Sequence, residues 1–281
     1  MKTFWIRTAS AVVYAALFLG CIFSGELLGS EFWGNIILLL FALFVAMGGT
    51  FEFFRMVEKQ GARPNKVMGY FYIAMMFLGM MVSCWEANSE VMLVVAFVMI
   101  AGLLLVVPFT LILQLWSNSE HPFADALYTI LPIFYIAIPL LLMPVLNDMK
   151  LLLLCVLMVW VNDSFAYMGG SLVGKHKMWP RHSPGKTWEG TAIGVAACVA
   201  LGIFVGPLLT PYLQWYDGLF LGLICGVVGT LGDLVESMLK RSTGVKDSGN
   251  IMPGHGGFLD RFDSLLVIIP FVLVYSMFFI H

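Results

Sequence analysis

Long runs of apolar residues alternate with short polar segments along the whole chain. A helix needs about 20 mainly apolar residues to cross a bilayer, and nine runs reach or approach that length. Their approximate ranges are 8–25, 33–54, 67–85, 91–114, 123–144, 150–169, 189–209, 217–237 and 262–280. The polar segments between them are too short to form a separate soluble domain. The pattern therefore predicts an all-α integral membrane protein of about nine transmembrane helices.

The composition agrees with this class. Of the 281 residues, 60% are hydrophobic and 11% are charged, whereas soluble domains average about 25% charged residues. The 5 cysteines are scattered singly, without a CxxC pair. The sequence therefore indicates neither a disulfide framework nor a cysteine-ligated zinc site.

The basic residues divide sharply between the two predicted sides of the membrane. With nine spans, fourteen of the 15 Lys and Arg residues fall on the side of the N-terminus, and Lys150 alone falls on the other. Cytoplasmic loops carry an excess of Lys and Arg. We therefore expect the N-terminus in the cytoplasm and the C-terminus outside.

Polar residues within or beside the spans concentrate in the C-terminal half. We accordingly expect residues 1–145 to form the first five spans and residues 146–281 to form a catalytic region of four spans, with a charged loop at 237–263. Asp163 lies near the end of a span, where a charge is costly and a functional role is the default. Pairing with a loop lysine is the simpler alternative.

The segment from His182 to Thr187 precedes a predicted helix. The hydroxyl groups of Ser183 and Thr187, with Lys186 between them, could cradle a phosphate at the helix N-terminus. The spacing is not that of a P-loop, and Ser-Pro-Gly is also ordinary turn chemistry.

Asp233, Glu236 and Lys240 recur at helical spacing at the end of the eighth span. An ion pair within the helix can explain Glu236 with Lys240. It explains Asp233 less well, because that residue lies deeper in the apolar run. A buried carboxylate of this kind is usually paired or ligates a cation.

A glycine-rich loop precedes the last span. Gly256 and Gly257 let the backbone approach a ligand closely, although a tight turn would need the same residues. Asp260 and Asp263 follow, among several Lys and Arg residues. The excess of cytoplasmic positive charge explains the basic residues but not the interleaved carboxylates. Cations for phosphates beside carboxylates for a metal are typical of phosphoryl or nucleotidyl transfer.

These residues resemble the signature of the phosphatidate cytidylyltransferase (CDP-diacylglycerol synthase) family. The matching positions are Ser237, Leu239, Lys240, Arg241, Lys246, Asp247, Pro253, His255, Gly256, Gly257, Asp260, Arg261 and Asp263. Residues 162–167 and 183–190 resemble two further blocks of the family, with Asn162 and Gly185 as departures. The resemblance covers residues 150–281.

The resemblance implies a membrane enzyme that transfers the cytidylyl group of CTP to phosphatidic acid, giving CDP-diacylglycerol and pyrophosphate. It implies Mg²⁺, with Asp233 and Asp260 as ligands; a second cation is left open. We expect the catalytic residues to be Asp233, Lys240, Arg241, Asp260 and Arg261. Expected substrate-binding residues are Asp163, Ser183, Lys186, Thr187, Ser237, Lys246, Asp247, His255, Gly256 and Gly257. The implied location is the inner membrane, with the site facing the cytoplasm. No nucleic-acid partner is expected, and a homodimer is left open.

Two other functions fit parts of the pattern. A CTP-dependent lipid kinase of the polyprenol-kinase type would share a membrane CTP site but transfer the γ-phosphate. A transporter of anionic metabolites would explain the helices and the basic residues. Transporters usually place their site near the bilayer midplane within related repeats, whereas this polar cluster lies at one face and no repeat is evident.

The predicted topology can be tested by labelling. In a background without native cysteines, a single cysteine at Lys177 should be protected from an impermeant thiol reagent on intact cells. A cysteine placed at the C-terminal end should react with it. Equal reactivity from the outside at both positions would contradict the nine-span arrangement.

Overall fold

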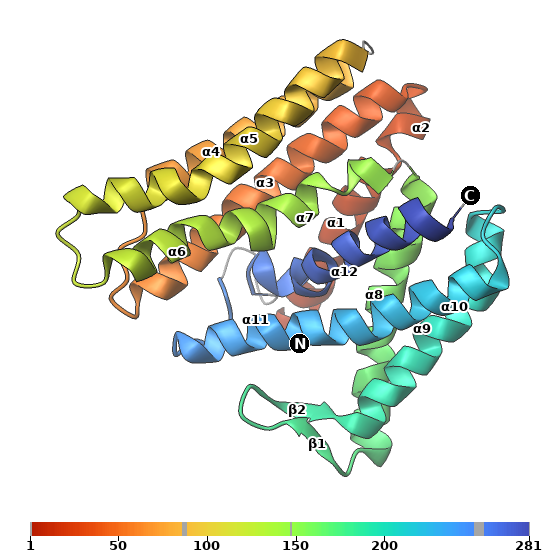
Figure 1. Ribbon diagram of the computed structural model, residues 1–281. Helices are drawn as coiled ribbons and strands as arrows, with labels where there is room; N and C mark the ends of the chain where they lie inside the picture. Colours follow the sequence, from red (N-terminus) through yellow and green to blue (C-terminus); the bar gives the residue numbers. More distant parts are fainter. Residues whose placement is uncertain (1, 86–88, 147, 250–255, 281) are drawn as a thin grey trace. The chain divides into compact units, whose positions relative to one another are not determined.

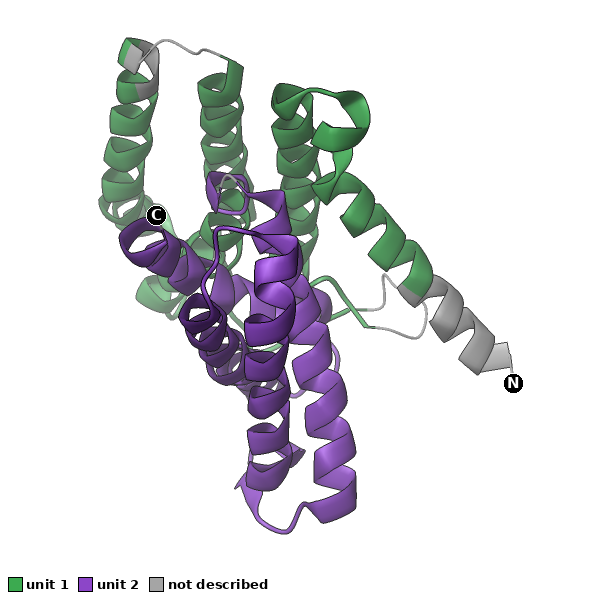
Figure 2. Cartoon of the chain, turned by 90° about the vertical axis from the view of Figure 1, so that its right-hand side faces the viewer, with its two compact units in different colours: residues 1–141, 248–258 green, residues 142–247, 259–281 purple. Residues whose placement is uncertain are grey.

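The computed structural model describes residues 2–85, 89–146, 148–249 and 256–280. The chain divides into two compact units (Figure 2). Unit 1 comprises residues 1–141 together with 248–258, and unit 2 comprises residues 142–247 together with 259–281. The chain therefore passes from unit 2 into unit 1 and back again within the charged loop that precedes the last helix.

Unit 1 is built from helices (Figure 1). They are α1 (Lys2–Ile22), α2 (Ser24–Leu28), α3 (Glu31–Glu58), α4 (Lys66–Trp85), α5 (Ser89–Leu113), α6 (Pro122–Pro132) and α7 (Ile138–Leu141). A 3-10 turn, Gln114–Trp116, follows α5. A π-helical turn, Ile133–Ala137, joins α6 to α7. It directly follows Pro132, whose ring nitrogen cannot donate the usual helical hydrogen bond.

Unit 2 contains four long helical stretches and a small hairpin. Its elements are a 3-10 turn (Pro144–Leu146), α8 (Met149–Val173), β1 (Lys177–Trp179), β2 (Ser183–Thr187), α9 (Trp188–Leu209), α10 (Trp215–Leu223), α11 (Gly229–Ser242) and α12 (Leu259–Phe279). A π-helical turn, Ile224–Val228, makes α10 and α11 one continuous apolar stretch. The two strands pair antiparallel.

The expectation of an all-α membrane protein is confirmed. Among the described residues, eight helices are long and apolar enough to cross a membrane, and each overlaps one of the second to ninth predicted spans. The first predicted span, 8–25, overlaps α1, in which Val12–Ile22 form a shorter apolar helical stretch. The count of nine and the orientation of the termini therefore stay predictions. The hairpin was not predicted.

Small residues let the helices of unit 2 approach closely. Gly202 of α9 and Gly218 of α10 are both buried. A Cβ on Gly202 would lie 2.0 Å from the carbonyl oxygen of Gly218, so these two helices meet backbone to backbone. At the other end of α9, a Cβ on Gly190 would lie 2.9 Å from Cα of Gly170 in α8. Such glycine contacts are typical of helix packing in membranes.

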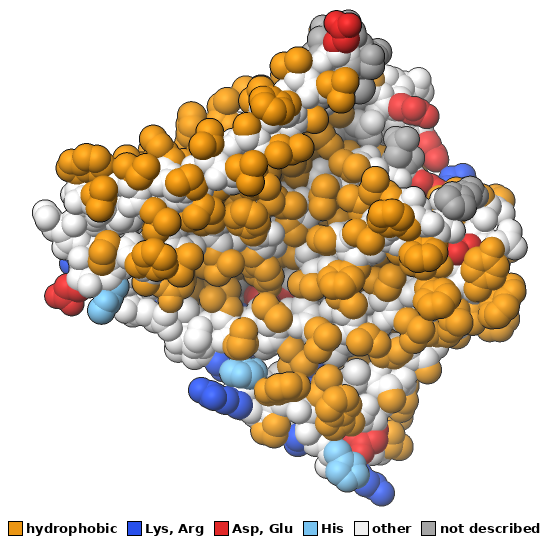
Figure 3. All heavy atoms as spheres, in the orientation of Figure 1, with side chains coloured by type: hydrophobic (Ala, Val, Ile, Leu, Met, Phe, Trp, Pro, Cys, Tyr) orange, Lys and Arg blue, Asp and Glu red, His pale blue; other side chains and the backbone are white. Residues whose placement is uncertain are grey.

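The hairpin lies between α8 and α9 and is held at its base. Thr187 caps α9, because its side chain accepts a hydrogen bond from the Gly190 amide at 3.2 Å. The Glu189 carboxylate accepts hydrogen bonds from the amides of Lys175 and His176. Lys, Arg and His side chains gather around this end of unit 2, whereas apolar side chains cover most of the visible helical surface (Figure 3).

Candidate active site

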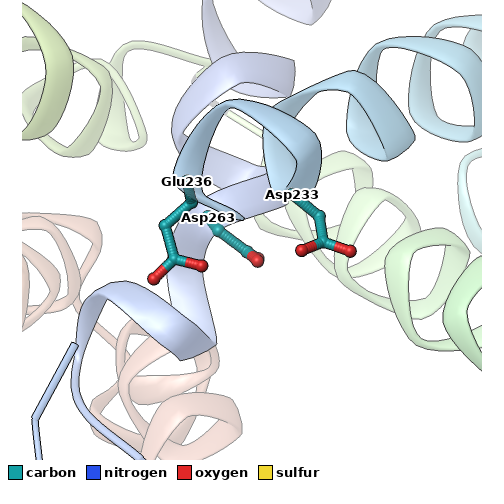
Figure 4. A group of neighbouring side chains, drawn as sticks. All are labelled: Asp233, Glu236 and Asp263. Carbon is teal, nitrogen blue, oxygen red and sulfur yellow. The ribbon is translucent and has the colours of Figure 1, made fainter. Parts of the chain in front are cut away.

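Three carboxylates from two helices of unit 2 converge. Asp233 and Glu236 lie on α11, Asp263 lies on α12, and one oxygen atom from each lies within 4.8 Å of the others (Figure 4). Residues three apart share a helical face, which explains why Asp233 and Glu236 point the same way. We call Asp233, Glu236 and Asp263 the carboxylate cluster.

Lys240 connects the ends of the same two helices. Its Nζ lies 2.5 Å from Oε2 of Glu236, one turn earlier on α11, and 2.6 Å from Oδ1 of Asp260 at the start of α12. Glu236 is fully buried, and only 11% of each of the Lys240 and Asp260 side chains is exposed. The ion pair within the helix expected for Glu236 and Lys240 is therefore present, and it extends to a second helix.

A second lysine reaches the cluster from the hairpin. Nζ of Lys186 lies 2.5 Å from Oδ2 of Asp233 and donates a longer hydrogen bond, 3.4 Å, to the carbonyl oxygen of Thr230. Lys186 and Asp233 are both largely buried. The hairpin thus brings the positive charge of Lys186 to a carboxylate of a membrane-spanning helix.

The carboxylate cluster fits a divalent cation. Carboxylate oxygens are the protein ligands that Mg²⁺ prefers, and one oxygen from each of the three carboxylates lies within 4.8 Å of the others. The Oε1 atom of Glu236 is buried and has no hydrogen-bond partner among the described residues. A buried carboxylate oxygen without a donor is costly, and a cation would satisfy it.

Helix α8 contributes polar groups beside α11. The Asn162 side-chain amide is buried and donates a hydrogen bond of 3.1 Å to the hydroxyl oxygen of Thr230. Asp163, the next residue, is exposed. Its charge interacts with those of Asp233, Lys186 and Arg261, so the structure places Asp163 in the electrostatic surroundings of the cluster.

The predicted phosphate cradle is a strand. Ser183–Thr187 form β2, with Ser183 paired to Trp179 and Thr187 paired to Lys177. Ser183 is half-buried, and Thr187 is buried with its hydroxyl oxygen engaged in capping α9. Of the three predicted cradle residues, the structure thus brings Lys186 into direct contact with the cluster.

The remaining predicted residues differ in their contacts and exposure. Ser237 donates a hydrogen bond of 3.4 Å to Oδ1 of Asp233. Arg241 donates to the carbonyl oxygens of His182 and Val245, which links the end of α11 to the hairpin. Arg261 is half-buried at the start of α12, whereas Lys246 and Asp247 are exposed.

The glycine loop belongs to the other unit. Gly256 and Gly257 lie in segment 248–258 of unit 1, and Gly256 has a positive φ of 81°. His255 lies outside the described residues.

Sequence reasoning gave no ligand role to Glu236 or Asp263. The spacing offered a sign of such a role. Glu236 and Asp263 each follow a predicted ligand by three residues, so each shares a helical face with that ligand. It also passed over Glu52, a carboxylate inside the second predicted span. A charge within a span is by itself a sign of function.

Comparisons with known proteins give one result. The model of the cytidylyltransferase family matches residues 5–279. A phosphatidate cytidylyltransferase of Staphylococcus epidermidis is 31% identical over 268 residues, which cover 94% of this chain and 96% of the relative. The same figures hold for the Staphylococcus aureus protein of that name. That of Bacillus subtilis is 52% identical over 117 residues, 41% of this chain and 42% of the relative.

The role of Lys240 as a buried counter-ion can be tested by its removal. Lys240→Met keeps most of the length of the side chain and removes the cation that Glu236 and Asp260 share. Breaking a buried ion pair in this way costs about 3–5 kcal/mol, so the unfolding midpoint in detergent should fall clearly. Lys246→Met, at an exposed lysine six residues on, is the matched control and should leave the midpoint unchanged. Equal midpoints for the two variants would show that Lys240 does not stabilise the helix ends.

Proposed function

The chain belongs to the phosphatidate cytidylyltransferase family, and from this premise we propose which of its residues carry out the transfer. The protein is a multi-pass membrane enzyme that makes CDP-diacylglycerol and pyrophosphate from CTP and phosphatidic acid. We place the reaction at the carboxylate cluster of unit 2. The observation that carries this placement is the meeting of three carboxylates with Lys186 and Lys240.

The main chemical difficulty of the reaction is the repulsion between its two negatively charged substrates. Two unit charges of the same sign at about 4 Å repel by roughly 4 kcal/mol at an effective dielectric constant of 20. The phosphate of phosphatidic acid and the triphosphate of CTP each carry more than one negative charge. A site that brings them together therefore has to supply positive charge and hold both groups in line.

We propose that Asp233, Glu236 and Asp263 hold Mg²⁺. When bound, the ion supplies Lewis-acid neutralisation of phosphate oxygens. The assignment of Asp260 as a ligand, made from the sequence, stays a prediction. Its carboxylate is bonded to Lys240, so a role in fixing that lysine is the alternative.

The cationic side chains have separate tasks. Lys186 stands on a hairpin and can exchange the Asp233 carboxylate for a phosphate oxygen of CTP, with Ser183 and Thr187 as neighbouring hydroxyl groups. Arg241 and Lys246 are exposed and are free of any ion pair recorded among the described residues, so they suit the mobile phosphates of the substrates. We assign Arg261 to the same task.

Three other polar residues would complete substrate binding. Ser237 and Asp163 would orient the substrate groups that lie near Asp233. Asp247 would take part in substrate binding together with Lys246, its neighbour in the chain. Gly256, with its positive φ, allows a close approach of the backbone to substrate, whereas the Cβ position of Gly257 is already filled by the Glu52 carboxylate. His255 has two candidate roles, donating to the departing pyrophosphate or shaping the loop.

The transfer itself needs little proton chemistry. An oxygen of the phosphatidic acid phosphate forms a bond to the α-phosphorus of CTP. The bond from that phosphorus to the oxygen bridging to the β-phosphorus breaks, and pyrophosphate leaves with the bonding electrons. The nucleophile is already an anion, so a strong general base is unnecessary, and catalysis is mainly positioning and charge neutralisation. The lipid enters sideways between helices and CTP arrives from the cytoplasm.

Radiolabelled CTP tests this function directly. With purified protein and phosphatidic acid in detergent, label in the α-phosphate should appear in the lipid product and label in the γ-phosphate should appear in pyrophosphate. A lipid kinase would instead place the γ-label in the lipid and leave the α-label in CDP. A transporter would give no labelled lipid from either nucleotide.

The metal assignment predicts the behaviour of three variants. Asp233→Asn and Asp263→Asn keep the size of the side chain and remove its charge, so each should lower kcat by about 100-fold, as for loss of an electrostatic stabiliser. Each should also weaken Mn²⁺ binding measured by electron paramagnetic resonance. Because both serve one ion, the double variant should be little worse than either single one.

The control for these variants is Asp148→Asn. Asp148 caps α8 through hydrogen bonds from the amides of Lys150 and Leu151, and asparagine caps helices equally well. Asp148→Asn should keep its activity and its Mn²⁺ affinity. Unchanged Mn²⁺ affinity in Asp233→Asn would remove that residue from the metal site. A loss of Mn²⁺ affinity in Asp260→Asn would establish Asp260 as a ligand.

A further inference from the structure

Unit 1 contains a buried carboxylate that the proposed reaction does not use. Glu52 lies on α3, and 1% of its surface is exposed. Burial of a charged carboxylate costs several kcal/mol unless hydrogen bonds and partners offset that cost. An apolar residue at this place would serve the packing of a membrane helix better. The presence of Glu52 therefore calls for a reason other than helix packing.

The contacts of Glu52 supply that reason. The Phe258 amide donates a hydrogen bond of 2.9 Å to Oε1, and the Ser248 hydroxyl group donates one of 2.8 Å to Oε2. Ser248 and Phe258 are the two ends of the segment that unit 1 takes from the charged loop. One carboxylate thus holds both ends of segment 248–258.

Two glycines of the segment make room for this carboxylate. A Cβ on Gly257 would lie 2.2 Å from Oε1 of Glu52, and a Cβ on Gly249 would lie 2.3 Å from the same atom. No real Cβ approaches an oxygen so closely. Neither glycine has a positive φ. Space for Glu52, rather than backbone freedom, is therefore what requires glycine at Gly249 and Gly257.

The same face of α3 holds the end of the segment. Phe44, Gly48 and Glu52 follow one another at intervals of four residues and so lie along one side of the helix. The ring of Phe44 packs edge-on against that of Phe258, with centroids 5.2 Å apart. A Cβ on Gly48 would lie 2.3 Å from the Phe258 ring. Phe258 is thus fixed through its ring and through its amide.

We propose that Glu52 is a positioning residue for the cytidylyl transfer, an inference that rests on the proposed function. Ser248 directly follows Lys246 and Asp247 along the chain, and Phe258 precedes Asp260 and Arg261 by two and three residues. Fixing Ser248 and Phe258 restricts where these charged neighbours can lie, because few rotatable bonds separate them. Glu52 thereby acts on the reaction without itself touching the substrates.

Variants of Glu52 separate positioning from simple stability. Glu52→Gln keeps an oxygen for the Phe258 amide and a polar partner for Ser248, so kcat should stay within about threefold of the unchanged protein. Glu52→Ala removes both bonds and should lower kcat per folded protein by about 10- to 100-fold, the scale of a misplacement near 1 Å. A purely structural role would lower the yield and the unfolding midpoint while leaving kcat per folded protein unchanged.

A steric double variant gives a second, independent readout. Gly257→Ala should lower kcat because its Cβ collides with the Glu52 carboxylate. The same change made in Glu52→Ala should cost nothing further, because the collision is gone. Gly102→Ala on α5, where a Cβ meets nothing within 4 Å, is the matched control and should be fully active.

The outcomes distinguish the two proposals. If the unchanged protein forms no CDP-diacylglycerol, the proposed function fails. If the unchanged protein is active and folded Glu52→Ala is equally active, or if the losses in the double variant are additive, the inference about Glu52 is wrong. If Glu52→Ala does not fold, Gly257→Ala is compared with Gly102→Ala, and equal activity of these two overturns the inference.

Discussion

A charged side chain that is buried away from water needs a partner of opposite charge. This constraint determines how the charged residues of the site are arranged. Removal of one partner of a buried ion pair typically costs about 3–5 kcal/mol. Lys240 therefore lies between Glu236 and Asp260, and Lys186 reaches from the hairpin to Asp233. These pairs connect α11, α12 and β2, so the groups that neutralise one another also hold together the elements of the site. The excess of carboxylates over lysines leaves a place for a cation.

The elements that present these groups are closely packed or tied by hydrogen bonds. The stripe of glycines on α9 lets it meet α8 and α10 at backbone distance, and the hairpin is tied at its base by Thr187 and Glu189. Sites held on packed helices keep their geometry better than sites on free loops. Unit 1 uses the same principle for the segment 248–258, where Glu52 accepts hydrogen bonds from both ends. Precise placement of phosphates is what a reaction governed by positioning requires.

The sequence predicted the spans and part of the site for identifiable reasons. Apolar runs of membrane length indicate helices directly, and helical spacing placed Asp233, Glu236 and Lys240 on one face. It could not indicate which carboxylate of α12 would meet Asp233. Asp260 and Asp263 lie three residues apart on nearly the same face, and the choice depends on the rotation of α12 against α11. The contacts of Glu52 lie 196 and 206 residues along the chain, beyond any local pattern. The hairpin was missed because Ser183-Pro184-Gly185 has the composition of a turn.

The central claim is that Asp233, Glu236 and Asp263 form the metal site of a cytidylyltransferase. Anomalous diffraction from crystals of the protein containing Mn²⁺ and CTP tests it most directly. The account predicts an anomalous peak within coordination distance of oxygen atoms from α11 and α12, including those of Asp233 and Asp263, with CTP phosphate oxygens on its open side. A peak that contacts neither Asp233 nor Asp263, in crystals with CTP bound, would contradict the account.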